Sequence, residues 1–88
     1  MLVLALALPL SSIRSDFYHR IIDLLVQARK AASLTQAELG MRIGQRQTFV
    51  SKVELRERRL DVAEFILICR ALEADPQQII QVAENEEH

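Results

Sequence analysis

The stretch "LTQAELGMRIGQRQTFVSKVE", residues 34–54, decides the fold because it predicts two short helices joined by a tight turn. Thr35 and Glu38 have the spacing of a capping box, in which the hydroxyl accepts from the third helical amide and the carboxylate reaches back. The first helix is therefore expected to start at Gln36 and to end near Ile43. Gly44 then suits the left-handed position that follows a helix. The second helix is expected over residues 47–55.

Apolar residues in this stretch indicate how the two helices pack together. Leu39 and Ile43 recur on one face of the first helix, and Val50 and Val53 recur on one face of the second. Gly40 is a small residue where the facing helix must approach closely. Two short helices joined by a short link that contains glycine define a helix-turn-helix.

The residues before this stretch predict one further helix, from about Asp16 to Ala32, which Ser15 or Asp16 is placed to cap. Its apolar side chains recur at spacings of three and four residues, which is typical of an amphipathic helix. This predicted stripe consists of Phe17, Ile21, Leu24, Leu25 and Ala28.

The residues after the stretch predict two more helices. Asp61 and Glu64 form a second cap-like pair, and the helix that they start is expected to be the most buried of all. Its apolar face comprises Val62, Phe65, Ile66, Cys69 and Leu72, widened by Leu67 and Ile68. Asp75 followed by Pro76 indicates the start of the last helix, whose apolar residues are Ile79, Ile80 and Ala83.

The predicted fold class is all-α, a compact five-helix bundle that contains a helix-turn-helix. Alternating strand-like runs are missing, and 88 residues leave no room for a second core. We divide the chain into an apolar amino-terminal arm or extension (1–14), the helical domain (15–83) and an acidic tail (84–88).

The small net charge of −1 hides an uneven distribution. Residues 42–59 carry six basic and two acidic side chains, whereas residues 60–88 carry one basic and seven acidic side chains. Segregated charge can direct one face of a protein towards an anion. The alternative is that each segment is an ordinary solvated surface.

The first ten residues, "MLVLALALPL", are strongly apolar. They are too short to span a bilayer, which requires about 20 residues, and no Lys or Arg precedes them as in a secretory signal. A membrane-tethered or exported protein that uses this segment is the less favoured interpretation, and no membrane partner is expected. Two interpretations are preferred for this segment. It is either an arm that packs against the domain or a second subunit, or an extra stretch from a misassigned translation start.

The outward edge of the helix predicted over residues 47–55 combines the side chains Gln47, Thr48, Ser51 and Lys52, followed by Leu55 or Arg56. An amide can bond adenine at two points, and short hydroxyls can serve several bases, so this composition suits the reading of base edges.

Residues 34–59 resemble the Cro and lambda-repressor type of helix-turn-helix, the XRE-like family. The family pattern is Leu-Thr-Gln-x-x-Leu-Ala-x-x-Leu-Gly, then Gln-Ser-x-Ile-Ser-x-Ile-Glu-x-Gly, and the resemblance covers about residues 24–80. The matching positions are Leu34, Thr35, Gln36, Leu39, Gly40, Ile43, Gly44, Gln47, Thr48, Val50, Ser51, Val53 and Glu54. Two departures are Arg46, where a small cap or proline is usual, and Leu55-Arg56, where glycine usually follows the glutamate.

The resemblance implies a lambda-repressor-like, sequence-specific transcriptional regulator. It would be a repressor that binds a palindromic operator in double-stranded DNA as a homodimer through the major groove. The implied base-reading residues are Gln47, Thr48, Ser51 and Lys52. The implied phosphate contacts are Gln36, Arg42, Arg46, Arg56 and Arg58, and Lys52 is a candidate for this role too. Ile79, Ile80 and Val82 are the first choice for the dimer surface, and the apolar arm is the second.

Other functional classes are less favoured. His19 and His88 lie far apart without a third ligand nearby, so neither a metal site nor another cofactor is expected. No catalytic set is placed for an enzyme. Cys69 is the only cysteine and is expected to be a buried small hydrophobe, which fits a reducing, cytoplasmic and nucleoid-associated location. Glu54 is expected to pair within the fold, with an arginine near the turn after the helix predicted over residues 47–55. The alternative function is an antitoxin-like or other regulator whose main partner is a protein.

Overall fold

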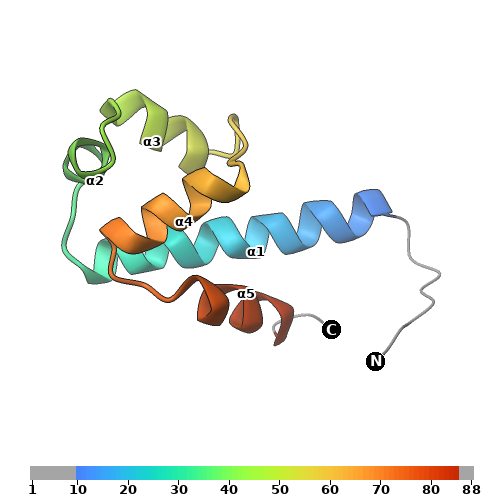
Figure 1. The fold of residues 1–88 in the computed structure, drawn as a ribbon. Helices are drawn as coiled ribbons and strands as arrows, with labels where there is room; N and C mark the ends of the chain where they lie inside the picture. Colours follow the sequence, from blue (N-terminus) through green and yellow to red (C-terminus); the bar gives the residue numbers. More distant parts are fainter. Residues whose placement is uncertain (1–9, 86–88) are drawn as a thin grey trace.

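The computed structural model describes residues 10–85, with side chains from residue 16 onwards. The described chain forms α1 (Leu10–Ala31), α2 (Gln36–Arg42), α3 (Gln47–Glu54), α4 (Val62–Ala71) and α5 (Pro76–Asn85) (Figure 1). The all-α, five-helix prediction is therefore confirmed. Residues 1–9, most of the predicted arm, and residues 86–88 of the acidic tail lie outside the described residues.

Two capping boxes start α2 and α4 where the sequence predicts them. The amide of Glu38 donates to Thr35 Oγ1 at 3.0 Å, and the amide of Thr35 donates to Glu38 Oε1 at 2.8 Å. The equivalent distances between Asp61 and Glu64 are 2.7 and 3.0 Å. The hydrogen bond from the Thr35 amide, followed by that from its hydroxyl, lowers the pKa of Glu38. These local bonds satisfy helix amides that would otherwise lack partners.

The first four helices end in the same way, with one residue in the left-handed backbone conformation. The residue after the left-handed one donates its backbone amide to a carbonyl in the last turn of the helix. At the end of α4, for example, the amide of Ala74 donates to the carbonyl of Cys69 at 2.8 Å. The left-handed residues are Ser33, Gly44, Arg56 and Glu73, with φ of 60°, 71°, 63° and 56°. Only Gly44 avoids the steric cost that this conformation imposes on other residues.

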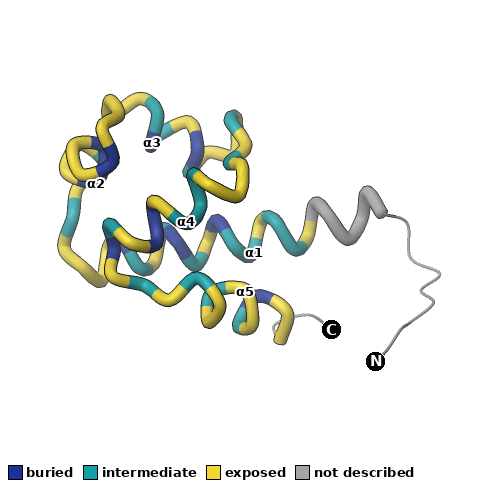
Figure 2. The backbone as a smooth tube through the Cα atoms, viewed as in Figure 1, coloured by how far each residue is buried: buried dark blue, intermediate teal, exposed yellow. Residues whose placement is uncertain are grey.

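The core lies between α1, α2, α3 and α4, on the inward faces marked in Figure 2. It consists of Ile22, Leu25, Leu39, Ile43, Val50, Val53, Ile68, Cys69 and Leu72. The four predicted contacts between the helices of the helix-turn-helix are all among these buried residues. A Cβ atom added to Gly40 would lie 2.8 Å from the carbonyl oxygen of Gln45, so the backbone that approaches Gly40 closely is the turn between α2 and α3 rather than the facing helix itself.

The prediction for the start of α1 is wrong. The helix begins at Leu10, so Ser15 and Asp16 lie inside it and do not cap it. Leu25 of the predicted stripe is buried, and so are Ile22 and Arg29, which the predicted stripe does not include. Apolar spacing predicts where a helix packs against its neighbours and does not by itself mark the residue at which the helix begins.

The prediction that α4 is the most buried helix is also wrong. Ile68 and Cys69 are buried, but Val62 is 78% exposed and Leu67 is 47% exposed. A ten-residue helix packed on one side cannot cover apolar residues all round its axis. The last helix, α5, packs along α1, where Arg20 Nε donates to the carbonyl of Ala83 at 2.7 Å. No helix within residues 10–85 is both long enough and apolar enough to cross a bilayer.

Candidate functional site

The outward edge of α3 is open to solvent along most of its length. Gln47, Thr48 and Lys52 are exposed, and Ser51 is half-buried. Val50 and Val53, on the opposite edge, are 2% and 4% exposed because they face the core. The helix therefore presents the four polar side chains that the sequence suggests for reading base edges.

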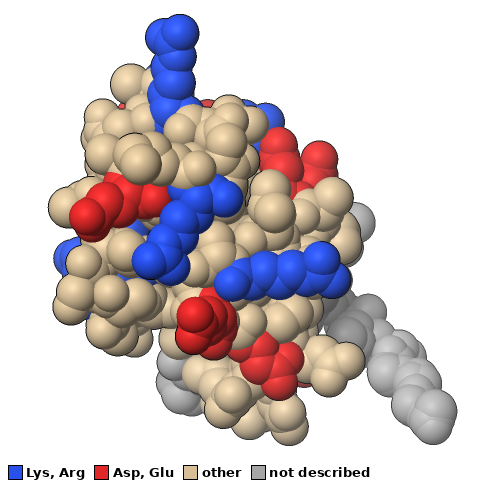
Figure 3. Space-filling view, turned by 60° about the vertical axis from the view of Figure 1, so that its left-hand side comes forward, with Lys and Arg blue, Asp and Glu red and all other residues tan. Residues whose placement is uncertain are grey.

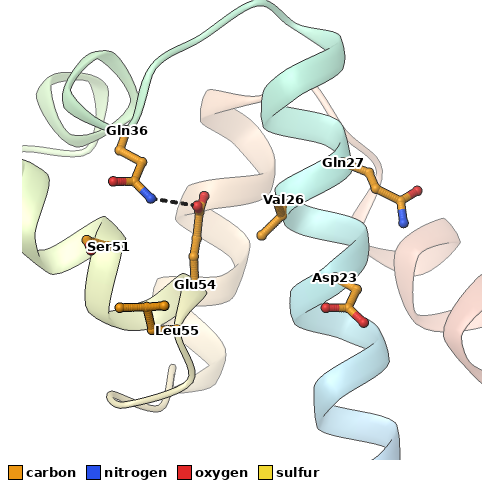
Figure 4. Close-up of a pocket in the computed structure, with 7 residues that line it drawn as sticks. All are labelled: Asp23, Val26, Gln27, Gln36, Ser51, Glu54 and Leu55. Atoms are coloured by element: carbon orange, nitrogen blue, oxygen red, sulfur yellow. Dashed lines mark hydrogen bonds between the residues drawn. The ribbon is translucent and has the colours of Figure 1, made fainter.

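A chain of hydrogen bonds orders the side chain of Gln47. Its Nε2 donates to Gln36 Oε1 at 2.6 Å. Gln36 Nε2 in turn donates to Glu54 Oε1 at 2.9 Å, the bond drawn in Figure 4. An ionised carboxylate only accepts hydrogen bonds, so Gln36 must turn its amide nitrogen towards Glu54 and its oxygen towards Gln47. Gln47 then keeps its own Oε1 and one N–H group for a partner outside the protein.

A buried ion pair anchors this chain to α1. Arg29 is 9% exposed, and its Nε and Nη2 donate to Glu54 at 2.6 and 3.0 Å. Its Nη1 donates to the carbonyl of Leu34 at 2.7 Å. The bidentate contact fixes α3 against α1 and against the loop that leads into α2.

The pairing of Glu54 within the fold is confirmed, but the predicted location of its partner is wrong. The arginine comes from α1 and not from the turn after α3. Sequence analysis missed this residue, although a signal was present: Arg29 follows Ile22 by seven positions and Leu25 by four. A charged residue on a buried stripe requires a partner in the interior.

An open pocket lies between α1 and α3 beside the ordered glutamine. In Figure 4, α1 supplies Asp23, Val26 and Gln27 to its wall, while α3 supplies Ser51 and Glu54 and is followed by Leu55. Leu55 is 63% exposed at the end of α3. The pocket keeps the Ser51 side chain accessible, so it does not pack inside the domain.

Several of the basic side chains in residues 42–59 have partners within the chain. Arg42 Nη1 donates to the carbonyl of Ala71 at 3.0 Å, which ties α2 to the end of α4. Arg56 contacts Asp23 at 3.2 Å in an exposed ion pair. Arg59 stacks on the ring of Tyr18, with 4.5 Å between guanidinium and ring centroid.

Arg58 is the most firmly held of these arginines. Its two terminal nitrogens donate to the two oxygens of Glu64, each at 2.9 Å, and its guanidinium lies 4.5 Å from the ring centroid of Phe49. The hydrogen bond to Glu64 raises the pKa of Arg58. Hydrogen bonds from Arg58, and then from the backbone of Asp61, lower the pKa of Glu64.

Arg46 and Lys52 differ from the other four basic residues. Both are exposed, and neither side chain forms a hydrogen bond or ion pair with any residue in the described part of the chain. Arg46 precedes Gln47 at the start of α3, and Lys52 follows Thr48 by one helical turn. Lys and Arg are interleaved with Asp and Glu on the face in Figure 3. The α3 edge is distinguished by the position of these two cations in the chain, next to Gln47 and one helical turn after Thr48.

The remaining predicted residues have structural positions. Ile79 packs against the core, Val82 is half-buried and Ile80 is 37% exposed. Cys69 is fully buried, and its burial, with a smaller contribution from Asp75, raises the pKa of its thiol to about 11. Within residues 16–85, His, Cys, Asp and Glu side chains form no group of three able to hold a metal ion.

Comparisons with known proteins agree with this geometry. The model of a family described as Helix-turn-helix matches residues 25–79. A solved structure, described as an XRE-family like protein from Pseudomonas syringae pv. tomato str. DC3000, is 44% identical in sequence and has a TM-score of 0.82. The similarity covers 89% of this chain and 95% of that one. No curated protein matches.

Proposed function

The chain belongs to the Cro/C1-type (XRE) helix-turn-helix family of DNA-binding domains, and from this premise we propose that it is a sequence-specific transcriptional repressor. In this proposal it binds a palindromic operator in double-stranded DNA as a homodimer and has no enzymatic activity. The observation that carries the proposal is the exposed α3 edge, on which an ordered Gln47 is accompanied by Arg46 and Lys52, whose side chains have no partner among residues 16–85.

Gln47, Thr48 and Ser51 are the proposed base-reading residues. An α-helix fits the major groove, where each base pair presents a distinct pattern of donors and acceptors. The free Oε1 and N–H group of Gln47 suit a bidentate contact with adenine. The hydroxyls of Thr48 and Ser51 can donate or accept, so their base preference depends on the neighbouring contacts.

Arg46 and Lys52 are the principal proposed phosphate contacts, and Gln36 is a further one through the second hydrogen of its Nε2, because the first is donated to Glu54. The two cations have no competing carboxylate among residues 16–85, so a phosphate would not have to displace such a partner. Lys52 can also reach a base edge from its position on α3. Arg56 is a secondary candidate, because exposed ion pairs such as the one it forms with Asp23 are weak and exchange readily.

Arg42 and Arg58 are weaker candidates for phosphate contacts. The guanidinium of Arg58 already satisfies both oxygens of Glu64, and that of Arg42 bonds the end of α4. Each would have to give up an intrachain hydrogen bond before it could bind a phosphate, which reduces the net gain from the new contact.

A homodimer is part of the proposal because one α3 helix contacts only a few base pairs. Two half-sites about 34 Å apart add affinity and select a two-fold-symmetric sequence. The outer face of α5 is the proposed contact, with Ile80 and Val82 as its apolar residues. Ile79 contributes less, since it packs against the core of its own chain.

The proposal is tested by selecting bound sequences from random duplex DNA with the purified full chain at near-physiological salt. We expect enrichment of a palindromic consensus. Enrichment of an asymmetric site would contradict the homodimer but not sequence-specific binding. A pool that stays random would contradict sequence-specific binding. A double variant that lacks the Gln47 and Thr48 side chains (Gln47→Ala with Thr48→Ala) provides the control and should enrich no consensus.

A further inference from the structure

A large apolar side chain stands at the end of the proposed DNA-binding edge and lies outside the core. Leu55, the residue directly after α3, is 63% exposed. Its backbone keeps the right-handed conformation, with φ of −81° and ψ of −2°, and its amide donates to the carbonyl of Ser51 at 2.9 Å. Leu55 therefore continues the helical path of α3, and the spacing rules of a helix apply to its side chain.

Helical spacing places Leu55 on the same edge as the proposed base-reading residues. Residues four and seven positions apart lie on one face of a helix, and Leu55 follows Ser51 by four positions and Thr48 by seven. Ser51 and Leu55 also line the same open pocket between α1 and α3 (Figure 4). The edge is therefore polar at its start and apolar at its last residue.

The two ends of this edge would reach different base pairs. From Thr48 to Leu55 the helix rises by about 10 Å at 1.5 Å per residue. Successive base pairs are spaced by about 3.4 Å along the duplex, so this rise corresponds to roughly three base-pair steps. Leu55 would then contact a base pair beyond those that Gln47 and Thr48 reach.

Leucine matches one kind of group among those that a duplex exposes in its major groove. All four bases present hydrogen-bonding nitrogen or oxygen atoms there, and thymine adds a C5-methyl group. A leucine side chain neither donates nor accepts, so placing it against a polar base edge would leave a buried donor or acceptor without a partner. A phosphate is disfavoured for the same reason, because a charge that is deprived of water requires a partner. Contact with the methyl group instead removes apolar surface from water on both sides.

We propose that Leu55 determines sequence specificity by packing against the C5-methyl group of a thymine in each operator half-site. The inference rests on the proposed function, because α3 must enter the major groove before Leu55 can meet a base. An exposed leucine gains more from such a contact than a leucine that the domain already covers, since more of its apolar surface leaves the water. The contact would specify a base pair that the hydrogen-bonding residues of the edge do not.

Replacement of thymine by deoxyuridine in the selected operator tests the contact, because deoxyuridine differs from thymidine only in lacking the C5-methyl group. Each thymine of one half-site is replaced in turn, and the affinity of the full chain is measured at fixed salt. We expect a position at which the replacement weakens binding by about fourfold, the value for burial of one carbon group. Leu55→Ala should bind the two operators equally at that position, and it should keep the fold because Leu55 lies outside the core.

Leu67→Ala provides the matched control. Leu67 is another exposed leucine, at 47%, but it lies on α4, so its variant should respond to deoxyuridine as the unaltered chain does. Equal responses of Leu55→Ala and the unaltered chain at every thymine would overturn the proposal, and so would an operator in which no replacement weakens binding. Either result with a palindromic consensus would leave the proposed function intact. A pool that stays random would overturn both the proposed function and the Leu55 contact.

Discussion

Gln36 and Gln47 form a side-chain hydrogen bond of 2.6 Å that joins the first residue of α2 to the first residue of α3. The bond directs the remaining donor and acceptor of Gln47 outward, because Glu54 fixes which end of Gln36 faces it. A side chain that is already oriented loses less rotamer freedom on binding. The helix-turn-helix thus orders its candidate base-reading residue before DNA is present.

Replacement of Gln47 by alanine should weaken binding to the selected operator by about 1–3 kcal/mol and relax the preference at one base pair. The physical reason is the loss of a bidentate contact, while phosphate contacts remain. Titration of operator and single-base variants at defined salt measures both effects. His19→Ala, on the exposed surface of α1, is the control and should change neither. Unaltered operator affinity in Gln47→Ala would rule out the base-reading role.

Loss of the charge at Glu54 should destabilise the fold. Glu54→Gln leaves Arg29 without its ion partner in a site where the two side chains are 13% and 10% exposed. We expect a loss of about 2–3 kcal/mol in the free energy of unfolding, less than the 3–5 kcal/mol of a fully buried pair. Asp23→Asn breaks the exposed pair with Arg56 and should cost less than about 1 kcal/mol. Urea unfolding measures both, and equal effects would show that burial does not decide the strength of these pairs.

The salt dependence of operator binding should identify the residues that contact phosphate. Arg46→Ala and Lys52→Ala should each reduce the slope of log affinity against log salt by about 1. Each variant lacks one phosphate contact, so one counterion fewer is released from the DNA on binding. Arg70→Ala, on the exposed surface of α4, should leave the slope unchanged. If neither variant changed the slope while Arg42→Ala or Arg58→Ala did, the intrachain partners of those arginines would be shown to release them on DNA.

The single left-handed residues that follow the helices predict opposite effects on stability when glycine is introduced and when it is removed. Glu73→Gly should stabilise the protein by about 0.5–1 kcal/mol, because glycine adopts this conformation without the penalty of a Cβ atom. Gly44→Ala should destabilise it by about 1 kcal/mol, and the loss must come from the backbone, since an added Cβ there has no neighbour within 4 Å. Thermal unfolding should shift by roughly 4–8 °C per kcal/mol for a domain of this size. Shifts in the reverse directions would contradict the assignment.

Acid should destabilise the domain partly through Glu64. Hydrogen bonds from Arg58 and Asp61 lower the pKa of this carboxyl in the folded state. As the pH falls, Glu64 is therefore protonated at a higher pH in the unfolded chain than in the folded protein. The stabilisation is present above about pH 5 and is lost as the pH falls through the lowered folded pKa. Glu64→Gln should therefore flatten the dependence of the urea midpoint on pH between about 5 and 2. Glu57→Gln, at an exposed carboxyl without a side-chain partner in residues 16–85, should keep the slope of the unaltered chain.

Local interactions explain which parts of this fold are predictable from sequence. The capping boxes of Thr35 and Asp61 and the left-handed turn at Gly44 depend on residues within a few positions of one another. The apolar spacing of Leu39 and Val50 predicts the packing of α2 on α3, because the link between them is too short for other arrangements. The sequence by itself therefore determined the helices, the helix-turn-helix and the polar edge of α3.

Tertiary structure alone decided how the charges of that edge are used. Arg29 meets Glu54 across 25 positions, Arg42 meets Ala71 across 29, and Arg56 meets Asp23 across 33. Composition shows six basic side chains in residues 42–59. In the folded protein several of them have intrachain partners, and the side chains of Arg46 and Lys52 have none among the described residues. The exposure of Val62 was likewise decided by which helices pack beside α4. Sequence spacing specifies which face of a helix is apolar or charged, whereas the partner of that face depends on contacts between distant segments.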